Sequence, residues 1–244
     1  MELLGCRLLE AKRVMFTQRY VSDELTHFVG RGRLEEDQYR LLVKIMSDGC
    51  LRAGGDADLD EGHIRLTFRW EQKLSESELF QPSMVCFCDI PVPDLAIHVK
   101  KYGRFGLGFG KKFLIEKGAA PVFYVPKGGP LIGQPRATLL DEAGREYEKL
   151  RSLPPTENPK EVKIPVQTPI DRFLDYVVFS YLKPFDESKT EDDPDNHYME
   201  REWRTLSSIR FTLSDVRRII IPEAYASRLR QNVPTYVGQV TFVE

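Results

Sequence analysis

The chain has 244 residues, with 35 lysines and arginines against 37 aspartates and glutamates and a formal net charge of -2. Hydrophobic residues make up 41% of the sequence and charged residues 30%, which is typical of a soluble globular protein. The small net charge excludes wholesale electrostatic attachment to nucleic acid, and no apolar run reaches the roughly 18 residues that a membrane span needs.

Apolar periodicity and turn residues predict strands that alternate with a smaller number of helices. In chain order we expect a strand at 25–29, a helix at 34–47, strands at 63–70 and 84–88, a helix at 94–102, strands at 105–109 and 121–125, helices at 138–150 and 168–181, strands at 198–206 and 218–221, a helix at 223–231 and a strand at 236–243. Gly49 and Gly103 are expected helix stops, and Thr168-Pro169 is an expected helix start.

The order of these elements lacks a regular βαβ alternation, so it favours an α+β fold with mixed or antiparallel curved sheets and flanking helices. We expect a single domain over residues 1–244. Residues 127–168, rich in proline and glycine, are interpreted as a loop-rich insertion around one helix. Residues 186–196 crowd acids together without hydrophobic residues and predict an exposed acidic loop.

The cysteine content indicates a reducing compartment. Cys6, Cys50, Cys86 and Cys88 are too few and too irregularly spaced for a disulfide framework in a chain of this length. The first residues also lack the long apolar region of a secretory signal. We therefore expect a cytoplasmic protein. The pair Cys86 and Cys88 has no second cysteine pair to complete a zinc site, so no metal is predicted.

The segment Glu200-Arg201-Glu202 carries the main candidate site. Successive residues of a strand point to opposite faces, so an extended chain would place Glu200 and Glu202 on one face and Arg201 on the other. Two carboxylates held that close can divide binding and charge stabilisation between them. The alternative is an edge strand with solvent-facing charges and Trp203 in the core.

Three further candidates lie earlier in the chain. His27 in the first strand can donate a hydrogen bond to a polar ligand, or can be satisfied within the fold. Asp89 ends an apolar strand, where it either orients a site or forms the turn. The basic residues of one glycine-rich segment interleave with aromatic residues and could contact nucleic acid, or form a solvated rim: Lys100, Lys101, Arg104, Lys111 and Lys112.

Several motifs together resemble the AbiGi family of abortive phage resistance proteins. The most specific are Phe-Cys-Asp-Ile-Pro at residues 87–91 and Tyr-Gly-x-Phe-Gly-x-Gly at residues 102–108, with His27-Phe28 and the Glu200-x-Glu202 segment as shorter matches. Members are described as the antitoxin-like partner in two-gene bacterial systems that stop phage propagation. The resemblance implies a defence role with a partner protein, and it supplies no reaction.

The order of His27, Asp89 and Glu200-x-Glu202 also resembles the motif order of ADP-ribosyltransferase folds, although no Ser-Thr-Ser follows on the middle strand. That similarity implies an NAD site with contacts from His27, Phe28, Asp89 and Tyr102. Glu202 would stabilise the charge that develops as nicotinamide leaves, and Glu200 would orient the acceptor. The rival hypotheses are a non-enzymatic partner-binding protein and a nucleic-acid-binding module.

Overall fold

The computed structural model describes residues 22–55, 64–151, 168–191, 193 and 195–244. Its centre is a seven-stranded sheet with the order β15-β14-β6-β1-β5-β12-β7, in which every neighbouring pair is antiparallel except β14 and β15. The strands of this sheet are β1 (Glu24–Phe28), β5 (Val85–Cys88), β6 (Gly106–Gly110), β7 (Ala120–Pro121), β12 (Glu202–Thr205), β14 (Val216–Ile221) and β15 (Gln239–Phe242).

Helices cover the sheet because its central strands are apolar on both faces. One core cluster joins α1 (Glu35–Asp48), α3 (Lys111–Glu116) and α6 (Ala226–Asn232) to the sheet, with Leu42, Leu107 and Ile219 wholly buried. A second, smaller cluster joins α2 (Ala96–Tyr102) to Cys88 and Ile220. Gly49 ends α1 in the left-handed conformation, with φ of 59°, which confirms the predicted stop.

The glycines of β6 let this strand lie close to its two neighbours. A Cβ added at Gly106 would lie 3.3 Å from the carbonyl oxygen of His27, and one at Gly108 would lie 3.1 Å from Cβ of Arg218. All five residues of β6 are buried. The glycine-rich segment is therefore a central strand that is packed closely against other backbones, as its alternation with bulky residues predicts.

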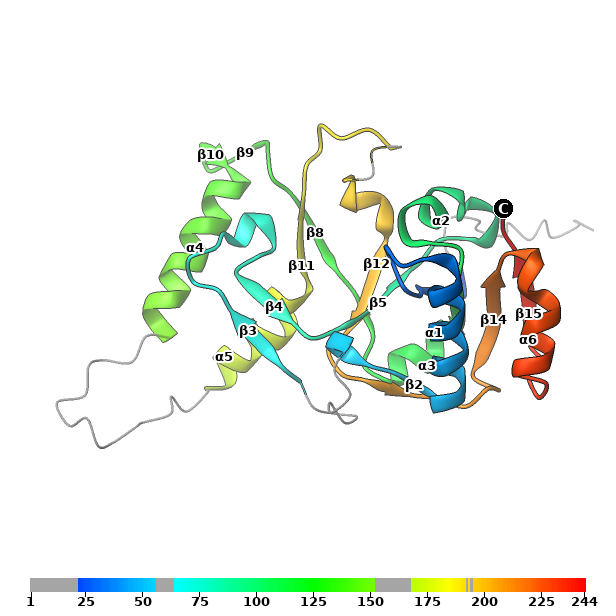
Figure 1. The fold of residues 1–244 in the computed structure, drawn as a ribbon. Helices are drawn as coiled ribbons and strands as arrows, with labels where there is room; N and C mark the ends of the chain where they lie inside the picture. Colours follow the sequence, from blue (N-terminus) through cyan, green and yellow to red (C-terminus); the bar gives the residue numbers. More distant parts are fainter. Residues whose placement is uncertain (1–21, 56–63, 152–167, 192, 194) are drawn as a thin grey trace, which may run out of the picture.

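A third cluster lies at the end of the molecule away from β14, β15 and α6 (Figure 1). It holds Leu74, Leu79, Phe80 and Tyr147 between the short strands and helices of this end. These elements are β3 (Leu66–Phe68) with β4 (Phe80–Pro82), α4 (Arg136–Arg151), α5 (Pro169–Phe173), a π-helical segment (Leu174–Val178) and a 3-10 turn (Phe179–Tyr181). The helix predicted at 138–150 is thus present and contributes to a core.

Smaller strand pairs complete the structure: antiparallel β2 (Cys50–Leu51) with β13 (Ile209–Arg210), antiparallel β9 (Pro130–Leu131) with β10 (Gln134–Pro135), and parallel β8 (Phe123–Pro126) with β11 (Leu182–Phe185). Isolated 3-10 turns occur at Ala53–Gly55, Leu74–Glu76, Val92–Asp94, His197–Glu200 and Glu223–Tyr225. No helix among the described residues is both long and apolar enough to cross a membrane.

The α+β prediction is confirmed, whereas several predicted strands differ in extent, among them the closing strand at 236–243, which is reduced to β15. The strand at 63–70 is reduced to β3, and His63 lies outside the described residues. The strand at 121–125 is divided, because the chain leaves the main sheet after β7 and pairs with β11 as β8. The strand at 198–206 begins only at Glu202, since a 3-10 turn precedes it. The single-domain and insertion boundaries stay predictions.

Candidate functional site

A pocket of about 280 Å³ lies between β1, β5, α2, β11 and the 3-10 turn before β12. Five of the six residues proposed from the sequence line it, and residues that the sequence did not suggest, among them Lys183 and Arg31, join them. The residues on which the site depends are His27, Phe28, Tyr102, Lys183, Glu200 and Glu202. We call this cavity the carboxylate pocket.

The two carboxylates meet by a route different from the one that the sequence predicted. Glu200 ends the 3-10 turn and Glu202 begins β12, so the segment is not one extended strand. Arg201 between them has φ of 44°, in the left-handed region. Both side chains nevertheless turn to Lys183 of β11, whose Nζ lies 2.5 Å from Oε2 of Glu200 and 2.5 Å from Oε2 of Glu202.

Further donors satisfy each carboxylate. Lys101 Nζ lies 2.7 Å from Oε1 of Glu200, and the hydroxyl of Tyr102 donates to the same oxygen. Arg204 Nε lies 2.6 Å from Oε1 of Glu202. Both carboxylates are buried, so these charge-assisted hydrogen bonds replace the water that the oxygens lose. Three cations therefore surround two carboxylates, which leaves an excess of positive charge.

This network keeps both acids ionised. Burial by itself would raise the pKa of Glu200, but the hydrogen bond from His197 and the attraction of Lys183 lower it well below the ordinary value. Burial also opposes ionisation of Glu202, and the charges of Arg204 and Lys183 lower its pKa. The pKa of Lys183 is raised, because the two glutamates outweigh the effect of its burial. The site is thus a fixed array of charges at neutral pH.

Another part of the wall of the carboxylate pocket is aromatic. The rings of Phe28 and Tyr102 are stacked with centroids 6.0 Å apart, and the guanidinium of Arg31 lies 5.1 Å from the centroid of Tyr102. His27 Nδ1 lies 2.9 Å from the carbonyl oxygen of Cys86, which can only accept, so Nδ1 carries the proton. Burial lowers the pKa of His27, which leaves Nε2 of the neutral ring as an acceptor.

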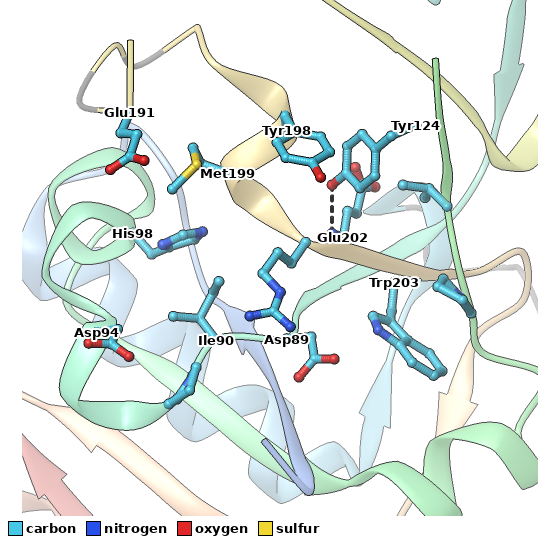
Figure 2. A pocket seen from close by; sticks show the side chains of 14 residues that line it. Asp89, Ile90, Asp94, His98, Tyr124, Glu191, Tyr198, Met199, Glu202 and Trp203 are labelled. Atoms are coloured by element: carbon cyan, nitrogen blue, oxygen red, sulfur yellow. Dashed lines mark hydrogen bonds between the residues drawn. The ribbon is translucent and has the colours of Figure 1, made fainter. Parts of the chain in front are cut away.

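Asp89 does not join this pocket. It lines a separate cavity of about 800 Å³, whose walls also include Trp203, Tyr198 and His98 (Figure 2). Its Oδ2 lies 2.7 Å from Lys111 Nζ, and its Oδ1 accepts from the backbone N–H of Ser22 at 3.2 Å. Asp89 and Tyr102 therefore line different cavities, and this geometry does not support the prediction that both contact one ligand.

The basic segment proposed for nucleic acid is largely engaged in ion pairs. Lys101 is paired with Glu200, Arg104 with Glu35, and Lys111 with Asp89. The two remaining cations, Lys100 and Lys112, are exposed. In the part of the chain that the structure describes, no group of three or more histidines, cysteines or acids is arranged to hold a metal ion.

Sequence reasoning missed Lys183 and Arg31. Lys183 is the single charged residue of the apolar run 182–185. This position was the available signal, because a lysine that is buried among apolar residues needs an acidic partner. Arg31 follows the first strand in a glycine-containing turn, where a surface arginine is unremarkable. Neither residue could be linked to Glu200 before the strands were placed in space.

Fold and site define an α+β protein with a buried network of charges beside an aromatic wall. Residues 68–236 match the model of a family described as putative abortive phage resistance protein AbiGi, antitoxin. This match covers more than half of the chain, and the chain belongs to that family. The matched region contains Tyr102, Lys183, Glu200 and Glu202 but not β1 with His27. No curated protein and no solved structure matches the chain at a significant level.

Proposed function

We propose that this protein serves as the antitoxin-side component of a two-gene phage-defence system and that its carboxylate pocket binds NAD. The family description supports the defence role, and an antitoxin implies a toxin as its partner. NAD binding is supported by one observation: a stacked aromatic pair, an excess of cations and two ionised carboxylates line the same pocket.

The nicotinamide, a ribose and the diphosphate of NAD each have a chemically suitable counterpart in the carboxylate pocket. The ring of Tyr102 offers a surface on which the nicotinamide can stack, and the carboxylate of Glu200 can accept from ribose hydroxyls. Arg31, which is exposed beside Tyr102, suits the negatively charged diphosphate. The volume of about 280 Å³ lies just below the ~300–1,000 Å³ usual for small-ligand sites, so one nucleoside half fills it while the other lies toward the surface.

ADP-ribosyl transfer is the catalytic extension of this proposal. It would break the bond between nicotinamide and ribose and join the ribose carbon to an acceptor nucleophile, which loses a proton. Glu202 would stabilise the developing positive charge. Two cations already compensate this carboxylate, Arg204 at 2.6 Å and Lys183 at 2.5 Å, so it has less charge to offer. This arrangement favours binding as the first activity, and a non-enzymatic antitoxin as the alternative to transfer.

Calorimetric titration with NAD tests the binding proposal. We expect saturable heat with the parent chain and a roughly 10-fold loss of affinity in Arg31→Gln, because one charge-assisted contact to the diphosphate is lost. Arg33→Gln is the matched control, since Arg33 is also exposed, lies two residues away and does not line the pocket. Absence of NAD heat in the parent chain, or equal losses in the two variants, would contradict NAD binding here.

Release of nicotinamide tests the catalytic extension separately. Transfer predicts slow release by the parent chain and a fall on the order of 100-fold or more in Glu202→Gln. Circular dichroism of Glu202→Gln is needed beside it, because removing this carboxylate leaves Arg204 without its main partner. Binding of NAD without release would reject transfer and retain the binding proposal.

A further inference from the structure

The larger cavity is separated from the carboxylate pocket by the segment that runs from the 3-10 turn into β12. Its volume of about 800 Å³ falls within the ~300–1,000 Å³ range of small-ligand sites. Figure 2 shows Tyr124, Tyr198 and Trp203 on one side of the cavity and His98, Met199 and Asp94 on the other. Glu200 lines the carboxylate pocket and Arg201 lines the larger cavity, because the left-handed backbone at Arg201 turns the chain between them, whereas Glu202 borders both cavities.

Arg201 is the cation of this cavity. Its backbone is held in the left-handed region, with φ of 44°, while its carbonyl oxygen accepts from the backbone N–H of Asp89 at 3.1 Å. The left-handed conformation costs free energy for a residue other than glycine. It persists where the surrounding structure holds the backbone in place. Among the described residues, no hydrogen bond or ion pair engages its guanidinium.

The aromatic wall is suited to a planar group. Tyr124 and Tyr198 are in edge-to-face contact with centroids 5.2 Å apart, and Tyr198 is half-exposed. The hydroxyl of Tyr124 accepts from the backbone N–H of Glu202 at 2.8 Å, which fixes its ring against the strand (Figure 2). Trp203 completes this wall beside Arg201. Aromatic rings stack with nucleic acid bases irrespective of sequence.

The acids around the cavity limit the charge of a ligand. Asp89 is neutralised by Lys111 at 2.7 Å, and Glu202 is held by the cations of the carboxylate pocket. Asp94 and Glu191 are exposed at the margin and line the same cavity. One arginine therefore faces two marginal carboxylates, so the cavity carries no excess of positive charge. A phosphate there depends on direct contact with Arg201, and the marginal carboxylates repel each further phosphate group.

We propose that the larger cavity is a nucleotide site that takes a nucleoside monophosphate, with the phosphate on Arg201 and the base against Trp203 and Tyr198. This site is independent of NAD binding in the carboxylate pocket. It differs in its cation, its aromatic residues and its preference for one phosphate over several.

Trp203 provides a direct reporter, because the chain has 2 tryptophans and Trp70→Phe leaves only the one in the cavity. In this background, titration with AMP should change the tryptophan fluorescence saturably. ATP should bind at least 10-fold more weakly than AMP, because the marginal carboxylates repel the added charge. Adenosine and inorganic phosphate, tested separately, should each bind far more weakly than AMP. Calorimetry on the chain with both tryptophans should give the same AMP affinity.

Arg201→Gln should weaken AMP binding by roughly 10- to 100-fold, which is the loss of charge-assisted hydrogen bonds to a phosphate. Arg31→Gln, which changes only the carboxylate pocket, should leave AMP affinity unchanged. The proposal is overturned if AMP at millimolar concentration gives no saturable change, or if Arg201→Gln binds AMP as the parent does. If NAD binding is lost in Arg201→Gln but retained in Arg31→Gln, NAD occupies the larger cavity, and both the NAD assignment to the carboxylate pocket and the preference of the larger cavity for a single phosphate fail.

Discussion

Replacing Lys183 by methionine tests whether its ammonium holds the carboxylate pocket together. The side chain is 13% exposed and its Nζ lies 2.5 Å from both Glu200 and Glu202. Methionine is similar in length and carries no charge, so the substitution removes the shared cation with little change in packing. Removing one partner of a buried ion pair costs about 3–5 kcal/mol.

The expected loss lies at the lower end of that range. Glu200 keeps Lys101 and Tyr102 as donors, and Glu202 keeps Arg204. A loss of about 3 kcal/mol corresponds to a fall in melting temperature of roughly 6–12 °C for a domain of this size.

The assay is urea unfolding followed by circular dichroism, with Lys149→Met as the control. Lys149 is 70% exposed and its partner Glu146 is 2.6 Å away on the same helix, so its replacement should cost under ~0.5 kcal/mol. Lys183→Met combined with Glu202→Gln should be less unstable than the sum of the two single variants, because the pair is coupled. A stability of Lys183→Met within about 1 kcal/mol of the parent would refute the reasoning.

Three other measurements examine the fold. The pKa of Glu200 in the folded state lies below its ordinary value of 4.5, so the ionised carboxylate stabilises the fold above that pH. The free energy of unfolding should therefore fall as the pH drops below 4.5. A free energy of unfolding that does not change between about pH 6 and about pH 3 would contradict this. Gly108→Ala should destabilise the chain by about 1–3 kcal/mol, because its Cβ would lie 3.1 Å from Cβ of Arg218, and chemical denaturation measures it. Tyr147→Phe should cost about 1–3 kcal/mol by the same assay, since its hydroxyl bonds the wholly buried Asp175 at 2.7 Å, and a neutral effect would show that the carboxylate needs no such donor.

Local patterns predicted most elements because their causes lie within a few residues. The helix that ends at Gly49 needs only apolar spacing and a residue tolerant of the left-handed conformation. The start at Thr168 is likewise local, because its hydroxyl and the side chain of Asp171 form a capping box. The continuation of that helix was less regular than predicted, since a π-helical segment follows Phe173.

The candidate site was predicted in part. His27, Glu200 and Glu202 do line one pocket, but alternation along an extended strand was the wrong reason, because Glu200 lies in a 3-10 turn. That turn depends on Asn196, whose side chain accepts from the N–H of Tyr198 and donates to the carbonyl of Thr190. Such short-range side-chain bonds compete with strand formation and are difficult to weigh from sequence.

The sequence by itself determined the α+β class, the central apolar strands and the presence of paired acids near residue 200, since each follows from local chemistry and periodicity. Only the tertiary structure decided what those acids meet. Lys183 reaches them because β11 pairs with β8 outside the main sheet, and Arg201 faces the other cavity because its left-handed backbone turns the chain. Contacts between distant segments depend on strand order and turn geometry, which no single stretch of sequence encodes.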